Sequence, residues 1–145
     1  MTRTVWTIGY EQTTVDAFLA ALTAAGVEVV ADVRAIAASR RPGFAKTALA
    51  ANLKGAGIGY AHFHALGTPA DGRAAARAGN HAALTRIYAG QLELPEAIAA
   101  GAQLAALAST QRTALLCYER EPGCCHRTLL REAVLPDFTV VDLFP

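Results

Sequence analysis

Residues 4–33 read TVWTIGYEQTTVDAFLAALTAAGVEVVADV, and this stretch decides the fold. Residues 4–8 are β-branched or aromatic, which is typical of a strand. Thr14 then precedes apolar residues at helical spacing, and Gly26 supplies a stop signal for that helix. Residues 27–33 form a nearly continuous apolar run, as in a strand that is buried on both faces of a parallel sheet. A strand, a helix and a strand within about thirty residues predict a βαβ unit.

The rest of the chain continues this alternation. We predict helices at 44–53, 81–88, 94–108 and 125–135, and further strands at 58–66, 113–118 and 138–144. The segment 67–80 reads as a loop with one helical turn near 74–78, and its length is typical of a lid or a binding loop. The pattern predicts a single α/β domain over residues 1–145, with three layers, a mostly parallel sheet of about five strands and helices on both faces.

The composition is that of an ordinary globular protein, with 53% apolar and 17% charged residues. Residues 1–6 run straight into the first strand without the segments of an export signal. The alanine-rich stretch at 97–108 is too short to span a membrane. We therefore expect a cytoplasmic protein with no membrane partner. Its three cysteines are then free thiols, ligands or catalytic groups rather than a disulfide framework.

The net charge of +1 hides a strong segregation of charge along the chain. Residues 33–92 contain eight basic residues and a single acidic residue, Asp71, so this stretch carries +7 and the remainder carries −6. Such a basic stretch predicts a positive surface that faces an anionic small molecule or nucleic acid. The alternative is that folding disperses these charges over solvated helix faces.

Polar side chains follow three of the predicted strands at the point where each strand ends. In open parallel sheets, ligands bind beyond the carboxyl ends of the strands, and these ends meet at one edge. We therefore expect one site at this edge, built from Tyr10, Glu11, Asp32, Arg34, Cys117 and Glu119.

Residues 115–127 read as a strand, a turn and the start of a helix. A helix N-terminus stabilises negative charge, so the thiolate of Cys125 is favoured there, with help from Arg127 and from a charged His126. Cys125 is the preferred nucleophile, and no role is assigned to Cys124. The same geometry can instead hold a phosphate or carboxylate on the backbone amides, with Arg127 as a bidentate partner.

The other candidates each have a structural alternative. Cys117 is a second candidate nucleophile or a small buried apolar residue, and Glu119 and His126 are candidates for proton transfer. Glu119 can also be half of a surface ion pair, and His126 can be a helix-start residue that hydrogen-bonds the loop. Asp32 and Arg34 can form an ion pair that fixes the end of their strand.

Several familiar motifs are absent. There is no Cys-x-x-Cys pair, and adjacent residues such as Cys125 and His126 seldom ligate one ion, so we assign no metal ligands and no cofactor. The sixth residue after Cys117 is Gly123 and not arginine, so Cys117 does not begin the Cys-x5-Arg loop of cysteine phosphatases. Neither a Walker motif nor a dinucleotide-binding glycine motif is present.

Motifs from end to end of the chain resemble a known family. They are 7–11 (TIGYE), 32–34 (DVR), 39–44 (SRRPGF), 57–60 (GIGY) with His62, 66–67 (LG), 117–119 (CYE) and 125–127 (CHR). Together they resemble the family called domain of unknown function 488. The resemblance implies a small α/β domain whose motif residues form the site, which adds Ser39, Arg40 and His62 to the substrate-binding candidates. It supplies no reaction. Ala37 and Thr68 depart from the family pattern, and both positions concern loop shape.

The leading hypothesis is a cytosolic, thiol-dependent enzyme that acts on an anionic, phosphate-bearing substrate such as a nucleotide or nucleic acid. In this hypothesis Arg34, Arg40 and Arg127 hold the anion. Two alternatives remain open. One is a noncatalytic module that binds nucleotides or nucleic acid, and the other is a redox sensor that pairs Cys117 with Cys125.

Overall fold

The computed structural model describes residues 3–121 and 126–145. Its strands are β1 (Arg3–Gly9), β2 (Val29–Asp32), β3 (Gly59–His62), β4 (Thr113–Cys117) and β5 (Phe138–Leu143). Its helices are α1 (Val15–Ala24), α2 (Lys46–Gly55), α3 (Ala70–Arg77), α4 (His81–Leu92), α5 (Pro95–Thr110) and α6 (Arg127–Val134), with a short 3-10 helix, η1, at His64–Leu66. None of these helices is long and apolar enough to cross a membrane.

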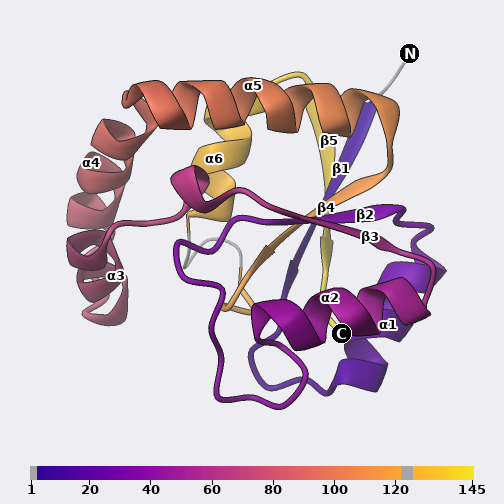
Figure 1. The fold of residues 1–145 in the computed structure, drawn as a ribbon. Coiled ribbons are helices and arrows are strands. Elements are labelled where there is room, and N and C mark those ends of the chain that lie inside the picture. The colour runs from indigo at the N-terminus through magenta and orange to yellow at the C-terminus, as the bar shows by residue number, and fades with distance from the viewer. Residues whose placement is uncertain (1–2, 122–125) are drawn as a thin grey trace.

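A five-stranded sheet forms the centre of the molecule in the order β3-β2-β4-β1-β5, and all neighbouring strands run parallel. Helices α1 and α2 cover one face, and α5 and α6 cover the other (Figure 1). The predicted α/β architecture, with helices on both faces of a parallel sheet, is thereby confirmed.

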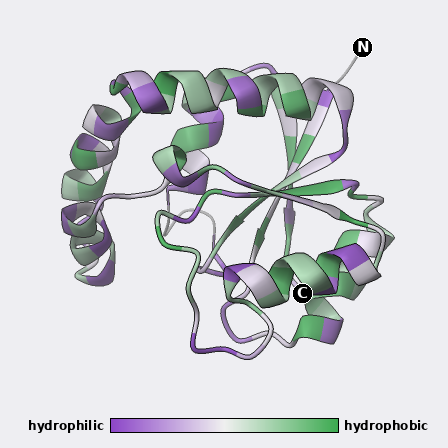
Figure 2. Ribbon diagram, in the orientation of Figure 1, coloured by the Kyte–Doolittle hydropathy of each residue, from purple (hydrophilic) through white to green (hydrophobic). Residues whose placement is uncertain are grey.

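The strands divide their apolar residues between two cores. On β1, Val5 packs in the core beneath α5 and α6, whereas Ile8 packs in the core beneath α1 and α2. On β4, the neighbours Leu115 and Leu116 separate in the same way, because successive side chains of a strand point to opposite faces. Figure 2 shows hydrophobic and hydrophilic residues alternating along α5, as expected of a helix that covers a sheet with one side only.

The first βαβ unit forms as its sequence predicts. The hydroxyl of Thr14 accepts a hydrogen bond from the backbone N–H of Ala17 at 3.1 Å, which caps the start of α1. Phe18 and Leu22 are fully buried, and each such burial contributes about 1.5–3 kcal/mol. Gly26 adopts a φ of 73° after the helix ends, a conformation that favours glycine.

The region after β3 differs from the prediction in two ways. The predicted strand at 58–66 ends at His62, because its partner β2 ends there, and the chain continues as η1. The predicted loop at 67–80 contains α3, because half of the eight residues of α3 are alanine, the strongest helix former. Gly72 is locally a helix breaker, but a Cβ atom there would lie 2.5 Å from Cγ2 of Thr68, so the helix needs a glycine at this contact.

Two glycines allow loops to close over the carboxyl end of the sheet. A Cβ atom on Gly9 would lie 1.8 Å from the carbonyl oxygen of Glu119, in the loop that follows β4. A Cβ atom on Gly67 would lie 2.1 Å from the backbone nitrogen of Ala35, in the loop that follows β2. Both positions therefore exclude a side chain, and both lie beside the predicted site.

We expect Gly9→Ala to destabilise the protein by at least about 3 kcal/mol, the upper end of the cost of overpacking, because two backbone segments would have to separate. Gly90→Ala is the matched control. Gly90 lies inside α4, where an added Cβ atom would meet nothing within 4 Å, so alanine should stabilise the helix by about 0.5–1 kcal/mol. Urea denaturation of the two variants measures both values, and equal midpoints would contradict the close approach at Gly9.

Candidate active site

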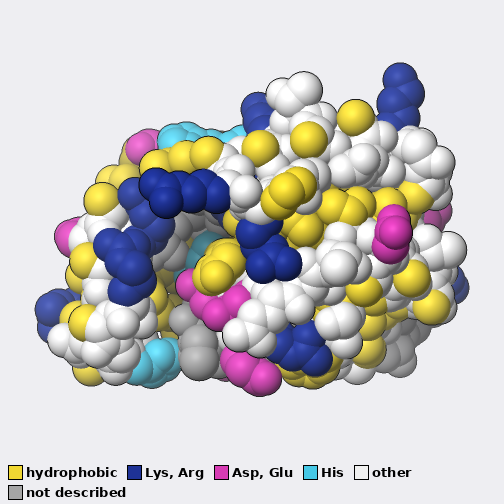
Figure 3. Space-filling view, turned by 90° about the horizontal axis from the view of Figure 1, so that it is seen from below, with side chains coloured by type: hydrophobic (Ala, Val, Ile, Leu, Met, Phe, Trp, Pro, Cys, Tyr) yellow, Lys and Arg dark blue, Asp and Glu magenta, His cyan; other side chains and the backbone are white. Residues whose placement is uncertain are grey.

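The site lies where the connections that follow neighbouring strands run to opposite faces of the sheet. Strand β4 lies between β2 and β1, and the chain leaves it towards α6 on one face, whereas β1 and β2 lead to α1 and α2 on the other. Ligands bind at such switch points in parallel sheets. A pocket of about 330 Å³ opens there, beside Tyr10, Arg34 and Cys117. Figure 3 shows Lys and Arg side chains gathered around a hollow on this side of the molecule.

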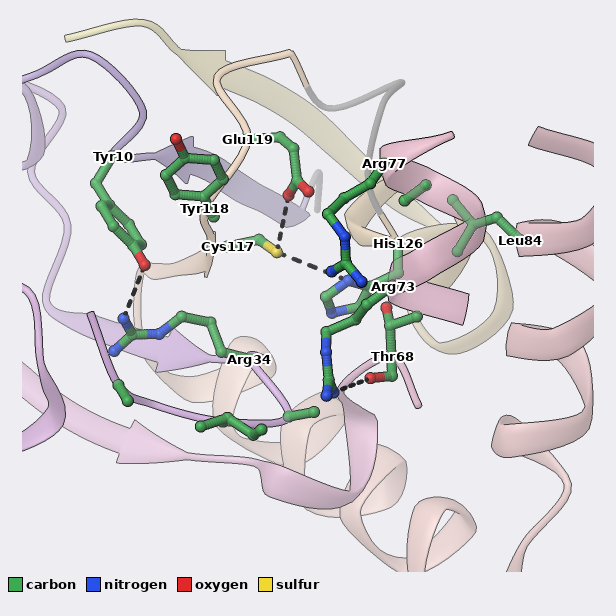
Figure 4. A pocket seen from close by; sticks show the side chains of 14 residues that line it. Tyr10, Arg34, Thr68, Arg73, Arg77, Leu84, Cys117, Tyr118, Glu119 and His126 are labelled. Carbon is green, nitrogen blue, oxygen red and sulfur yellow. Dashed lines mark hydrogen bonds between the residues drawn. The ribbon is translucent and has the colours of Figure 1, made fainter. Parts of the chain in front are cut away.

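Cys117, Glu119 and His126 meet on one wall of the pocket (Figure 4). The thiol of Cys117 donates to Oε2 of Glu119 at 3.3 Å, and its Sγ atom lies 3.7 Å from Nδ1 of His126. Only 7% of Cys117 and 3% of His126 is exposed. The fold therefore brings together three of the four residues that the sequence predicts as catalytic.

The hydrogen bond of Nε2 determines which ring nitrogen of His126 carries the proton. Nε2 lies 2.7 Å from the carbonyl oxygen of Val33, and because a carbonyl only accepts, Nε2 must carry the hydrogen. In the neutral ring Nδ1 is then the acceptor, and Nδ1 is the atom that faces the Cys117 sulfur. A thiol, a base and a group that orients the base are the parts of an activated nucleophile.

Asp32 and Arg34 form a buried ion pair at the end of β2. Nη2 and Nε of Arg34 donate to the two carboxylate oxygens of Asp32 at 2.7 and 2.8 Å, and the backbone N–H of Arg34 adds a bond of 3.1 Å. Burial alone would lower the pKa of Arg34, but its hydrogen bonds to Asp32 and the negative charge of that carboxylate raise it overall. The ion pair that the sequence allowed is therefore present, and it engages the guanidinium of Arg34.

The same pair holds other segments of the site. Nη1 of Arg34 donates to the carbonyl oxygen of Phe44 at 2.8 Å and to the hydroxyl of Tyr10 at 3.3 Å. The ring of Tyr10 stacks on Phe44, with 4.7 Å between the centroids. The hydroxyl of Tyr60 donates to Asp32 at 2.5 Å, and burial together with this bond raises the pKa of Tyr60. Strands β1, β2 and β3 and the loop before α2 are thereby tied together.

Arg127 and Glu11 support the loop after β4. Arg127 is fully buried, and its Nη2 donates to the carbonyl oxygen of Glu119. Oε1 of Glu11 accepts from the backbone N–H of Arg120 at 3.0 Å. Neither side chain is among the described residues that line the pocket.

Ser39, Arg40 and His62 also lie outside the described lining of the pocket. Nε2 of His62 is 2.8 Å from the carbonyl oxygen of Arg34, so this histidine supports the backbone beside the ion pair. The hydroxyl of Ser39 accepts from the backbone N–H of Arg41 at 3.1 Å, which shapes the loop. Arg40 is exposed.

The pocket is also lined by two arginines that are not among the predicted site residues. Arg73 and Arg77 lie one turn apart on α3, and Nη1 of Arg73 donates to the carbonyl oxygen of Thr68 at 2.9 Å. They are missing from the predicted site because the sequence predicts a loop where α3 forms. The spacing of these two arginines could have indicated a shared role, since residues four apart share one face of a helix.

The predicted nucleophile Cys125 lies outside the described residues, as does the predicted pairing of Cys117 with Cys125. The helix expected from Cys125 onward is described from Arg127. Within residues 3–121 and 126–145, no group of three or more His, Cys, Asp or Glu side chains is placed to hold a metal ion.

Comparison with known proteins gives one match. The model of a family described as "Domain of unknown function DUF488" matches residues 14–134, which include every helix and strand from α1 to α6. The predicted resemblance is thereby confirmed. No curated protein and no solved structure matches the chain.

We expect Asp32→Asn to lower the free energy of unfolding by about 3–5 kcal/mol, because it leaves the guanidinium of Arg34 buried without its counter-charge. Glu132→Gln is the control, since it breaks the pair of half-buried Arg131 and exposed Glu132, whose closest atoms are 3.6 Å apart. That change should cost less than about 1 kcal/mol. Urea denaturation at neutral pH compares the two, and similar losses would contradict a structural role for the buried pair.

Proposed function

The chain belongs to the DUF488 family, which carries no assigned activity, and we propose that it is a thiol-dependent enzyme that acts on an anionic small molecule. In this proposal Cys117 is the nucleophile, His126 is its base, and Glu119 is a second group for proton transfer. Cys125 remains a candidate thiol outside the described residues.

One observation carries the proposal. The hydrogen bond of 2.7 Å between Nε2 of His126 and the carbonyl of Val33 leaves Nδ1 as the acceptor beside the thiol of Cys117. A histidine that served only to fill the core would need no particular nitrogen to face the sulfur. The carboxylate of Glu119, 3.3 Å from the same sulfur, offers a second place for a proton.

The proposed reaction is a nucleophilic substitution in two steps. The thiol proton of Cys117 moves to Nδ1 of His126, and Sγ forms a bond to an electrophilic atom of the substrate. The bond to the leaving group breaks, and that group keeps the electron pair and takes the proton from His126. Water or a second nucleophile then attacks the same substrate atom and gives its proton to Glu119 or His126. The bond between that atom and Sγ breaks, the sulfur keeps the electron pair, and it regains a proton from that residue as the thiol of Cys117.

The charges around the pocket support an anionic substrate. The lining includes the three arginines Arg34, Arg73 and Arg77 and a single described carboxylate, Glu119. Guanidinium groups bind carboxylates and phosphates bidentately. A volume of about 330 Å³ is at the small end of ligand pockets, which favours a small molecule over a polymer.

The low exposure of Cys117, 7%, favours a second candidate function. In that reading the thiol is a buried apolar residue, and the protein is a noncatalytic module that binds a nucleotide or nucleic acid through its arginines. Binding of a nucleic acid would then weaken steeply with salt, as counterions are released. It would also survive Cys117→Ser unchanged, whereas turnover would not.

We expect neutral iodoacetamide to alkylate Cys117 at least about tenfold faster than it alkylates glutathione at neutral pH, because Nδ1 of His126 can take the thiol proton as the new bond to sulfur forms. His126→Gln should remove this advantage. Trypsin separates the cysteines for mass spectrometry, since the peptide 113–120 contains Cys117 alone and the peptide 121–127 contains Cys124 and Cys125.

The control variant is His64→Gln. His64 also bonds to a backbone carbonyl, that of Ala35 at 2.7 Å, but it is exposed and does not contact Cys117. It should leave the alkylation rate at Cys117 unchanged. A rate at Cys117 no faster than that of glutathione, or a rate that His126→Gln does not lower, would overturn the proposed nucleophile.

A further inference from the structure

The two arginines of α3 form a charged wall on one side of the pocket. Like charges four residues apart destabilise a helix, yet Arg73 and Arg77 both face the pocket (Figure 4). Within the described residues neither pairs with a carboxylate, since the ion pairs there are Asp32 with Arg34 and Arg131 with Glu132. Two guanidiniums on one face without a carboxylate partner among the described residues match the charge of a dianion such as a phosphate monoester.

The opposite side of the pocket is aromatic and is formed by Tyr10 and Tyr118 (Figure 4). Tyr118 is 44% exposed, although it is a large aromatic side chain. Tyr10 holds Tyr118 edge to face, with 5.3 Å between the centroids and 78° between the ring planes. Tyr118 therefore presents a supported ring at the mouth of the pocket, where a flat ligand ring can pack.

Cys117 lies between these two walls. Figure 4 shows Tyr10 and Tyr118 on one side of its sulfur and Arg73 and Arg77 on the other. Resting on the proposed function, we propose that the substrate is a phosphate monoester with a flat ring, of the size of a nucleoside monophosphate. Its phosphate binds Arg73 and Arg77, its ring packs on Tyr118, and the atoms that join the two pass Cys117.

The size of the pocket restricts the ligand further. About 330 Å³ accommodates one ring, one linking group and one phosphate, but not a dinucleotide or a longer chain. The remaining arginine of the lining, Arg34, is engaged by Asp32 and Phe44, so the arginines of α3 supply the anion-binding groups.

Titration calorimetry of the full chain with four probes tests this assignment: adenosine 5′-monophosphate, ribose 5-phosphate, adenosine and polyadenylate. We expect the monophosphate to bind at least tenfold more tightly than either ribose 5-phosphate or adenosine. Arg77→Gln, or Arg73→Gln with Arg77→Gln, should lower its affinity tenfold or more and leave that of adenosine unchanged. Tyr118→Ala should weaken the monophosphate and leave ribose 5-phosphate unchanged.

Arg86→Gln is the matched control, because Arg86 is an exposed arginine on α4 outside the described pocket lining. It should leave every affinity unchanged. Arg77 is itself exposed, so its single variant should fold as the wild type does. Equal affinity of wild type and Arg77→Gln for the monophosphate, or tighter binding of polyadenylate per nucleotide, would overturn the inference, the latter in favour of nucleic acid.

A second measurement separates this inference from the proposed thiol chemistry. Iodoacetate carries a negative charge and iodoacetamide does not, so the ratio of their rates at Cys117 reports the charge at the arginine wall. We expect Arg73→Gln with Arg77→Gln to lower this ratio severalfold and to leave the iodoacetamide rate unchanged. An unchanged ratio would overturn the arginine wall alone, whereas a slow iodoacetamide rate in the wild type would overturn the nucleophile alone.

Discussion

Asp32 has no exposed surface, and the free energy needed to remove its carboxylate from water must be offset within the protein. Arg34 and Tyr60 supply the compensating hydrogen bonds. Because the guanidinium of Arg34 also binds the carbonyl of Phe44 and the hydroxyl of Tyr10, the ion pair fixes parts of the chain that are far apart in sequence. The edge of the sheet at which the pocket opens is therefore built around one buried charge pair.

The ion pair also connects to the chemistry of the pocket. Val33 lies between the two paired residues in the sequence, and its backbone N–H donates to the carbonyl of Leu116 on β4 at 3.2 Å. The carbonyl of Val33 is thus held in place, and it is the group that orients the ring of His126. The close approach at Gly9 positions the loop that carries Glu119 on the other side of the thiol. Packing and charge burial together determine which atoms face Cys117.

The sequence predicts the fold well where local signals and tertiary structure agree. The βαβ unit at 4–33 carries a capping threonine and a stop glycine, and the structure follows both. The prediction for segment 67–80 is wrong because Gly72 signals a loop, whereas in the fold this glycine lies inside a helix and packs closely against Ile87 of α4, where a Cβ atom would lie 3.2 Å from Cγ2. The grouping of Cys117, Glu119 and His126 follows from the edge of the sheet, but the choice of ring nitrogen depends on the carbonyl of Val33, which no sequence pattern encodes.

In the folded protein, the basic residues of segment 33–92 divide into those that lie outside the pocket and those that border it. Several of its charges, including Arg40, Lys46, Lys54 and Arg86, are exposed outside the described pocket lining, where solvent screens them. Arg73, which is half-buried, and Arg77, which is exposed, instead border a concave pocket and act on a bound ligand at close range. The electrostatic character of the site therefore depends on one face of one short helix, and the total charge of the segment is a poor guide to it.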